Sequence, residues 1–361
     1  MRLVPIGCRT ADHRRAGRPV RILASMTALV AGLLTVAGCT GSSSSTATPT
    51  FSDASNVVRV AETPGVGDAP LFIAFQQGLF RKAGLQVRIT NYASTRSELI
   101  ALRAGKADVA FGDYADMFYA QAQAQGKGSN NSLNLVIVAD GYDAVANTME
   151  VLALPNSHIV TPQNLVGKTV ATASPQVMPS NVQGQPYSLD TVATQSVLIN
   201  NSVKPSSINW QPLPPQAPPQ ALIQALATHQ VNAILATEPT IFEAESQLGA
   251  VPVLDSCTGA TSNLPLDGYF STRTFASAHR SKLTAFRTVL YQAQGLADNQ
   301  SQPVRTTLEG SEGMSVEDAS LLTIGQYPTT VSVNDLQRVI SLMFSFNAIP
   351  RQPSVKAMIF H

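Results

Sequence analysis

Short apolar runs alternate with amphipathic segments from Val57 to Asp113, and each apolar run ends in a polar turn. Short apolar runs bounded by turn residues predict buried strands, whereas apolar residues spaced three and four apart predict helices. The order strand, helix, strand, helix, strand predicts a parallel sheet whose strand ends open on one crevice. The predicted strands are 57–61, 85–90 and 109–111, and the predicted helices are 71–83 and 94–104.

The same alternation continues and then restarts at Met149. A helix at 114–125 and a buried strand at 133–139 complete the first series. The second series has predicted strands at 149–154, 169–172, 208–213, 231–236 and 251–254, and predicted helices at 188–200, 220–228 and 239–248. From Gly268 onward the pattern predicts one strand at 269–272 and helices around 281–298, 316–322 and 333–346.

Two such series followed by a helical tail predict an α/β protein with two lobes, each a mostly parallel sheet flanked by helices. A chain of 361 residues is long enough for both. We expect lobe 1 to begin at 57–143, lobe 2 to span 144–254, and 255–361 to return to lobe 1. A ligand cleft between the lobes would close when the lobes rotate about the segments that cross from one lobe to the other. One large sheet is the alternative, because periodicity does not separate the two arrangements.

Residues 1–38 have the pattern of a signal peptide, with six Arg ahead of the apolar run 22–37. The sequence Val36-Ala37-Gly38-Cys39 resembles a bacterial lipobox, which implies cleavage before Cys39 and lipidation of its thiol. The Ser- and Thr-rich residues 39–56 predict a flexible spacer. We expect an exported protein anchored by Cys39 to the outer face of the cell membrane. An ordinary signal peptide and a twin-arginine export route stay open.

The charge argues against one class of binding partner, and the cysteine content limits disulfide pairing. Residues 1–38 hold six of the 24 basic residues and one of the 23 acidic residues, so the remainder has a net charge of −4. It contains no basic run, which argues against a nucleic-acid partner. Cys8 leaves with the leader, and lipid on Cys39 would leave Cys257 without a partner for a disulfide.

Four segments carry family-like motifs: 69–85, 101–110, 164–170 and 214–239. They resemble the extracytoplasmic binding components of ABC importers for sulfonates, nitrate-like anions and thiamine pyrimidine precursors. Their order and spacing carry the resemblance, which implies the type II periplasmic-binding fold, an ABC permease with its ATPase as partner, and a monomer. Asn232 and Thr237 depart from the family pattern, and this leaves the ligand open.

The turns after the predicted strands supply the candidate ligand residues. Small residues let backbone N–H groups approach a ligand, helix starts and an Arg suit an anion, and carboxylates suit an amine or an aminopyrimidine. Simple helix capping and core packing are the alternatives for these residues. The candidates are Thr63, Gly67, Asp68, Ser94, Thr95, Arg96, Asp113, Tyr114, Ser174, Ser188, Glu238 and Tyr269, with Tyr142 as a further aromatic that could stack on a ligand.

Other kinds of site find little support. Gly65-Val66-Gly67 is followed by Pro70 where a dinucleotide fingerprint needs its third glycine. The His residues have no metal-ligand spacing, so neither a metal nor a cofactor is expected. We therefore expect a solute-binding lipoprotein that captures a sulfonate-like anion or a pyrimidine or vitamin precursor. The alternatives are a dehydratase-like enzyme on the same fold and a surface lipoprotein that binds a protein.

Overall fold

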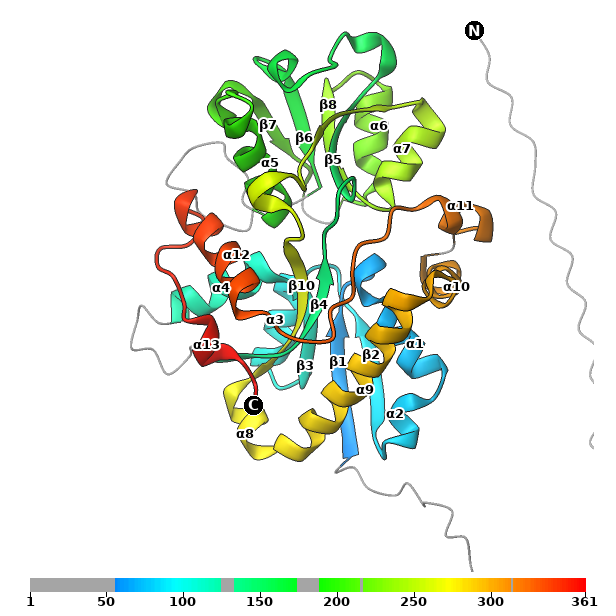
Figure 1. Ribbon diagram of the computed structural model, residues 1–361, viewed down its shortest axis with the longest axis vertical. Helices are drawn as coiled ribbons and strands as arrows, with labels where there is room; N and C mark the ends of the chain where they lie inside the picture. Colours follow the sequence, from blue (N-terminus) through cyan, green and yellow to red (C-terminus); the bar gives the residue numbers. More distant parts are fainter. Residues whose placement is uncertain (1–55, 125–132, 174–187, 215–216, 313) are drawn as a thin grey trace, which may run out of the picture. The chain divides into compact units, whose positions relative to one another are not determined.

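Two five-stranded sheets organise the chain in its computed structural model, which describes residues 56–124, 133–173, 188–214, 217–312 and 314–361. The leader, Cys39 and the spacer up to Ser55 lie outside the described residues. We call the sheet that contains β1 the first sheet and the one that contains β5 the second sheet (Figure 1).

The first sheet has the strand order β2-β1-β3-β10-β4. β1 pairs in parallel with β2 and β3, whereas β10 runs antiparallel to both β3 and β4. Four strands therefore run one way and β10 runs the other. The bounds are β1 Val57–Glu62, β2 Gln86–Asn91, β3 Val109–Asp113, β4 Leu135–Asp143 and β10 Pro265–Thr272.

The second sheet repeats this pattern in the order β7-β6-β8-β5-β9. β6 is parallel to β7 and β8, and β5 is antiparallel to β8 and β9. The predicted α/β architecture is therefore confirmed, with both sheets mixed: one strand in each, β10 or β5, runs antiparallel to its two neighbours. The bounds are β5 Met149–Ala153, β6 Thr169–Thr172, β7 Asn209–Pro212, β8 Ala233–Thr237 and β9 Val251–Asp255.

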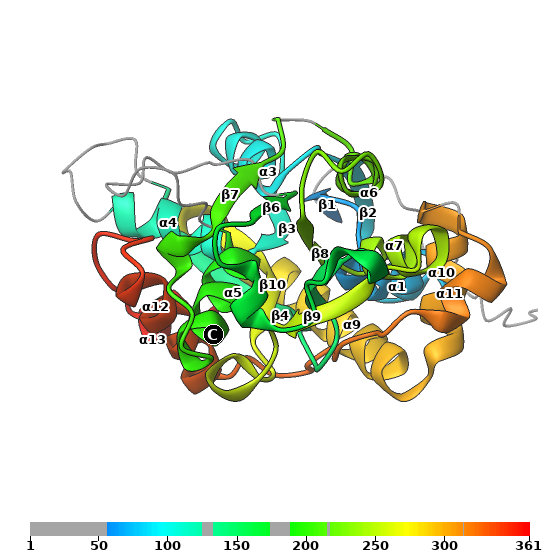
Figure 2. The ribbon, with the colours of Figure 1, turned by 90° about the horizontal axis from the view of Figure 1, so that it is seen from above.

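Helices cover both faces of the first sheet, as the two views in Figures 1 and 2 show. The predicted helix 71–83 is wrong in one respect: it is two helices, divided where Gly78 adopts a left-handed φ of 66°. Three short or polar helices, α8, α10 and α13, were not predicted. The bounds are α1 Ala69–Gln76, α2 Leu79–Lys82, α3 Thr95–Arg103, α4 Tyr114–Ala124, α8 Arg273–Ala278, α9 Arg280–Asn299, α10 Ser301–Glu312, α11 Val316–Leu321, α12 Val333–Ser345 and α13 Val355–Met358.

The second sheet has α5 packed on one face and α6 and α7 on the other. The helices are α5 Leu189–Asn200, α6 Gln220–Ala227 and α7 Thr240–Leu248. Single turns of 3-10 helix connect several elements, at Val66–Asp68, Pro155–Ser157, Pro162–Leu165, Pro205–Ser207 and Gly259–Thr261. No helix within the described ranges is both long and apolar enough to cross a membrane.

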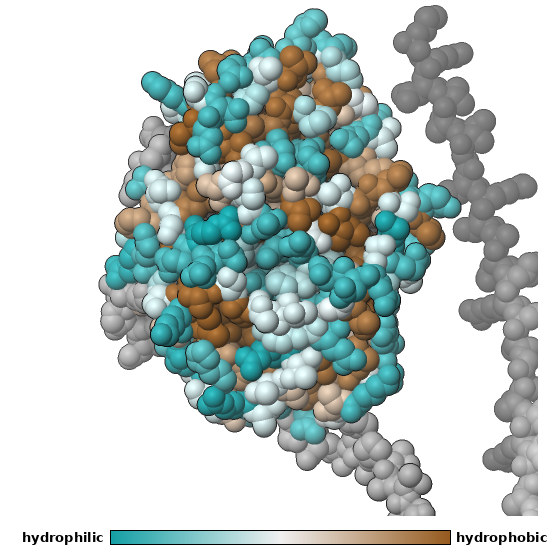
Figure 3. Space-filling model, in the orientation of Figure 1, coloured by the Kyte–Doolittle hydropathy of each residue, from teal (hydrophilic) through white to brown (hydrophobic). Residues whose placement is uncertain are grey.

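Aromatic pairs join α2 to α9 and β3 to β10 in the core beside the first sheet. The Phe80 and Phe286 rings stack with centroids 5.2 Å apart, and Phe111 and Tyr269 lie 4.7 Å apart. Some large apolar side chains remain exposed, such as Ile100 at 60% and Leu321 at 67%. Figure 3 shows hydrophilic and hydrophobic residues interspersed over the face in view. Single exposed apolar residues of this kind are ordinary on a protein surface.

The chain passes from one sheet to the other twice, and the two passing segments hydrogen-bond to each other. Between β4 and β5, Ala144 N donates to Leu264 O over 2.9 Å. At the other end of the segments, Ser256 N donates to Met149 O, also over 2.9 Å. A third segment, after α11, joins them where Asp143 and Gln326 exchange backbone hydrogen bonds.

Candidate ligand site

A pocket with a volume of about 610 Å³ lies where strands of both sheets end. On the first sheet it is reached by the turn after β1 and by the last residues of β3. On the second sheet it is reached by the ends of β6 and β8. This is the position where α/β sheets bind ligands, because the turns at the carboxyl ends of parallel strands converge there. The volume is that of a small-molecule site.

Six of the predicted site residues line this pocket, together with Tyr142. Two of them, Thr63 and Thr95, use their hydroxyls within the protein: Thr63 Oγ1 donates to Glu98 over 2.6 Å, and Thr95 Oγ1 accepts from Asp113 N over 3.0 Å. They therefore fix the pocket floor. The six are Thr63, Gly67, Thr95, Asp113, Ser188 and Glu238.

The structure does not bring Tyr114 and Tyr269 to the pocket, contrary to the prediction. Both side chains are fully buried in the core. Tyr114 Oη donates to the buried Asp140 Oδ1 over 2.7 Å, and the Tyr269 ring packs between Phe111 and Phe286. Packing of a large ring decides its direction, and in both cases it points into the core. This is the packing alternative named above.

Asp68, Ser94 and Arg96 also lie outside the pocket lining. Asp68 is fully buried, whereas Arg96 is exposed. Ser94 caps α3 by accepting a hydrogen bond from Ser97 N, so the capping alternative holds for it. Ser174 lies outside the described residues.

Asp113 both lines the pocket and caps a helix. Its Oδ1 atom accepts hydrogen bonds from Ala115 N (2.5 Å) and Asp116 N (3.1 Å) at the start of α4. The side chain keeps some exposed area on the pocket. Oδ1 therefore caps the helix, while no described residue donates a hydrogen bond to Oδ2.

Glu238 has both carboxylate oxygens engaged by backbone groups. Oε2 accepts from Phe242 N over 3.2 Å in the first turn of α7, and Oε1 accepts from Thr323 N over 3.0 Å. Its pKa is raised mainly by burial, which these hydrogen bonds partly offset. Glu238 thus reaches the pocket wall as a structural group.

Three carboxylates in the pocket were not among the predicted site residues: Asp190 on α5, Glu243 on α7 and Asp267 on β10. Asp190 follows Ser188 by two residues, so a closer look at that helix start could have found it. Asp267 had no such signal, because its strand begins at Pro265 and contains Gly268, both poor strand formers.

Burial raises the pKa of these carboxyl groups. It raises that of Asp267 to about 7 and that of Asp190 to about 6. Burial also raises the pKa of Asp113 well above its ordinary value, and the charges of Asp116 and Asp267 raise it further. Near neutral pH, part of this carboxyl population is therefore protonated when the pocket is empty.

The model of the NMT1-like family matches residues 54–306. No curated protein is a significant sequence match.

Solved structures share the fold at low identity. The alkanesulfonate-binding protein SsuA from Xanthomonas axonopodis pv. citri, bound to MOPS, has a TM-score of 0.64 and 18% identity, covering 84% of this chain and 98% of that one. The periplasmic nitrate-binding protein NrtA from Synechocystis PCC 6803 has a TM-score of 0.63 and 13% identity, covering 84% of each chain. The desulfurization enzyme DSZB has a TM-score of 0.65 and 12% identity, covering 84% of this chain and 96% of that one. These matches place the described residues in the periplasmic-binding-protein fold.

Proposed function

This chain belongs to the NMT1-like family, and from that premise we propose that it is the extracytoplasmic solute-binding component of an ABC importer. It captures a small organic molecule in the pocket and delivers it to a membrane permease. The observation that supports this most is the pocket itself, which takes residues from the strand ends of two separate sheets. A binding protein that closes on its ligand needs contacts from two bodies, because closure follows the differential affinity of the ligand for the closed state.

The proposed lobes are 57–143 with 255–361 around the first sheet, and 144–254 around the second. The paired segments at Ala144–Leu264 and Met149–Ser256 act as the hinge. A hinge needs a few residues at element ends that absorb the change in φ and ψ. Both pairs lie directly at such ends, so the lobes can rotate while each sheet keeps its hydrogen bonds.

We infer an exported, monomeric protein that is held on the outer face of the membrane by lipid on Cys39. Residues 39–56 separate the lipid from the binding unit and let it reach the permease. Intact mass measurement of the protein extracted from membranes tests this: an acylated N-terminal Cys39 is expected, and Cys39→Ala should appear in the aqueous fraction. Wild-type protein with an unmodified Cys39 in the aqueous fraction would contradict the anchor.

Binding in the pocket is tested by thermal unfolding of the purified protein with a panel of sulfonates, nitrate, pyrimidines, vitamins and amines. A ligand at 100 times its Kd stabilises a protein by about 2.7 kcal/mol, which raises Tm by roughly 5 °C for a chain of this size. Thr237 is exposed and lines the pocket, so Thr237→Trp should fill the pocket and abolish the shift. Thr306→Trp, on the exposed side of α10, is the matched control.

The proposal fails if no compound stabilises the protein and native mass spectrometry of protein from its own host finds no retained small molecule. We assign no catalytic role. One of the matched structures, DSZB, is an enzyme, so an enzymatic function is the alternative. Turnover of a bound compound by the purified protein would favour it.

A further inference from the structure

The pocket is lined by five carboxylates and, among the described residues, by no Arg, Lys or His side chain. Residues 174–187, which separate the pocket residues Ala173 and Ser188 in sequence, contain no Arg, Lys or His either. An anion in this pocket would meet negative charge without an opposing cation. The five carboxylates are Asp113, Asp190, Glu238, Glu243 and Asp267.

Two of these carboxylates stand directly opposite each other. β3 and β10 pair antiparallel with Asp113 in register with Asp267. Side chains of directly opposite residues lie on the same face of a sheet, and like charges there are destabilising. The pair is therefore costly in the empty protein, and a positively charged group between the two side chains would remove that cost.

These two side chains also retain free acceptor capacity. The hydrogen bonds from described residues to Asp113 all reach Oδ1, and no described residue donates to either oxygen of Asp267. Both side chains are partly exposed on the pocket. Three carboxylate oxygens are thus placed to accept N–H groups of a ligand, which is the recognition chemistry of an ammonium or amidinium group.

A third carboxyl group lies behind this pair. Glu98 is fully buried, and its Oε2 atom has no hydrogen-bond partner among the described residues. A Cβ atom on Gly112, which lines the pocket between Phe111 and Asp113, would be only 2.6 Å from Glu98 Oε2. The charge of Asp267 adds to burial in raising the pKa of Glu98 well above its ordinary value. A raised pKa means that Glu98 is largely protonated in the empty pocket, so it adds negative charge only when a cation above Gly112 favours its ionised form.

The remaining lining mixes Thr, Ser and Gln side chains with apolar ones, and the apolar part includes two aromatic rings and two Met side chains. Phe111 lies two residues before Asp113 and Leu266 directly before Asp267, and the apolar lining also includes Tyr142, Met149 and Met314. Aromatic faces attract cations, and apolar side chains bury the carbon skeleton of a ligand. The volume of about 610 Å³ is far larger than a metal ion needs.

We propose that the pocket binds an organic cation, with an ammonium, amidinium or guanidinium group seated between Asp113 and Asp267 and an apolar body against Phe111 and Leu266. This inference rests on the proposed solute-binding function and names the charge class of the solute. Asp113 and Asp267 accept the N–H groups of the cation.

The test uses small-molecule extract of the host, separated at pH 7 into fractions retained by a sulfonate cation exchanger, retained by a quaternary-ammonium anion exchanger, or retained by neither. Each fraction is added to the purified protein, and thermal unfolding is recorded. The stabilising activity is expected in the cation-exchanger fraction. Activity in the anion-exchanger or unretained fraction overturns the charge class and leaves the solute-binding function standing. Absence of activity in every fraction overturns the solute-binding function itself, and this proposal with it.

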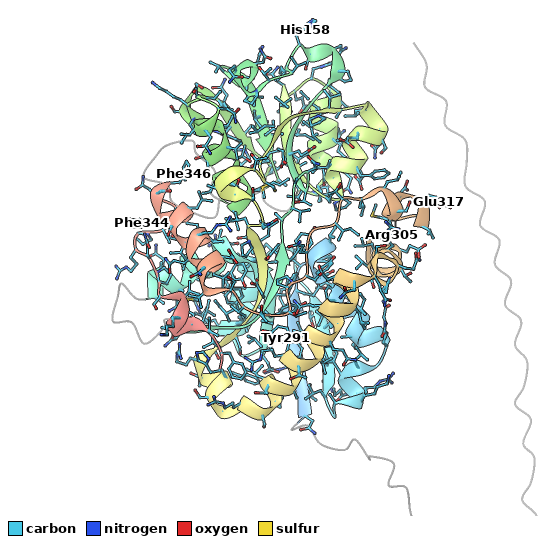
Figure 4. All side chains as sticks on the ribbon, viewed as in Figure 1. His158, Tyr291, Arg305, Glu317, Phe344 and Phe346 are labelled. Carbon is cyan, nitrogen blue, oxygen red and sulfur yellow. The ribbon has the colours of Figure 1, made fainter. Side chains whose placement is uncertain are left out.

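The variant Asp267→Asn then tests whether the Asp113–Asp267 pair binds the cation. The variant keeps the size of the side chain and removes the like-charge pair, so without extract its Tm is expected to equal or exceed that of the wild type. It should need at least about tenfold more of the active fraction for half-maximal stabilisation. Glu317→Gln, whose side chain points away from the protein on α11 (Figure 4), should behave as the wild type. If Asp267→Asn and the wild type need the same amount of the active fraction, the cation does not bind between Asp113 and Asp267.

Discussion

The Glu238 carboxylate joins two parts of the chain that are 85 residues apart: Oε1 accepts a hydrogen bond of 3.0 Å from the backbone N–H of Thr323. Glu238 follows β8 of the second sheet. The segment of Thr323 continues to Gln326, which pairs with Asp143 at the end of β4 in the first sheet. This carboxylate therefore ties the second sheet to a segment that is held by the first.

Glu238→Ala should lower the free energy of unfolding, because it leaves the N–H groups of Phe242 and Thr323 without their acceptor. Hydrogen bonds to a charged group contribute about 1.5–3 kcal/mol each, so a loss of about 2 kcal/mol or more is expected. Urea unfolding with Glu317→Gln as control measures it. Glu238→Gln retains one acceptor oxygen and should lose about half as much. Wild-type stability of Glu238→Ala would mean that Thr323 finds an equivalent acceptor.

Gly112→Ala should destabilise the pocket floor. The added Cβ would lie 2.6 Å from both Glu98 Oε2 and Thr95 Oγ1, which are held in place by burial and by Asp113 N. Overpacking of this kind costs about 1–3 kcal/mol. Gly65→Ala is the matched control in the same pocket, since its Cβ meets no atom within 4 Å. Equal Tm values for the two variants would show that the floor yields to the methyl group.

Asp108→Ala should destabilise the first sheet more than the loss of an exposed ion pair would. Asp108 is 4% exposed and accepts from Arg59 N (2.9 Å), Nε (3.0 Å) and Nη2 (2.5 Å). Loss of the acceptor leaves the Arg59 backbone N–H of β1 unsatisfied, and we expect a cost of about 2 kcal/mol. Asp335→Ala breaks a pair whose two side chains are 40% and 39% exposed, and it should cost less than about 1 kcal/mol. Chemical denaturation of both variants measures whether Asp108→Ala loses more free energy of unfolding than Asp335→Ala does.

The ligand-free protein should become less stable as pH rises from about 5 to about 8. The pKa of Asp267 is raised to about 7 and that of Asp143 to about 8, mainly by burial. The folded chain therefore binds more protons than the unfolded chain across this window, and the free energy of unfolding falls with rising pH.

Urea midpoints at pH 5, 6.5 and 8 measure this slope, and Asp267→Asn should flatten it. A midpoint that increases with pH would contradict the expected sign. Other titratable groups surround Asp267, and its charge raises the pKa of Glu98, Asp113, Asp140, Tyr142 and Tyr269. Glu62 also raises the pKa of Glu98 and Tyr269, and Arg96 lowers that of Asp116.

Strand positions were predictable where the signal is local. The runs at 57–61 and 109–111 became β1 and β3, and the turns after them supplied Thr63, Gly67 and Asp113 to the pocket. The predicted helix 71–83 was wrong only at Gly78, where a residue in the left-handed conformation divides it into two helices. Caps at Ser94 and Ser188 were likewise visible in sequence, because a cap depends on residues within one turn.

The sequence alone determined the two α/β series, the turns that carry polar residues and the family, because spacing and turn chemistry are local properties of the chain. Only the tertiary structure decided which of these residues share a pocket. It inserted β10 between β3 and β4 and so placed Asp267 opposite Asp113, from positions 154 residues apart by number. It also turned Tyr114 and Tyr269 into the core. Strand pairing across long separations and the packing of large rings depend on the whole fold, and no local pattern encodes them.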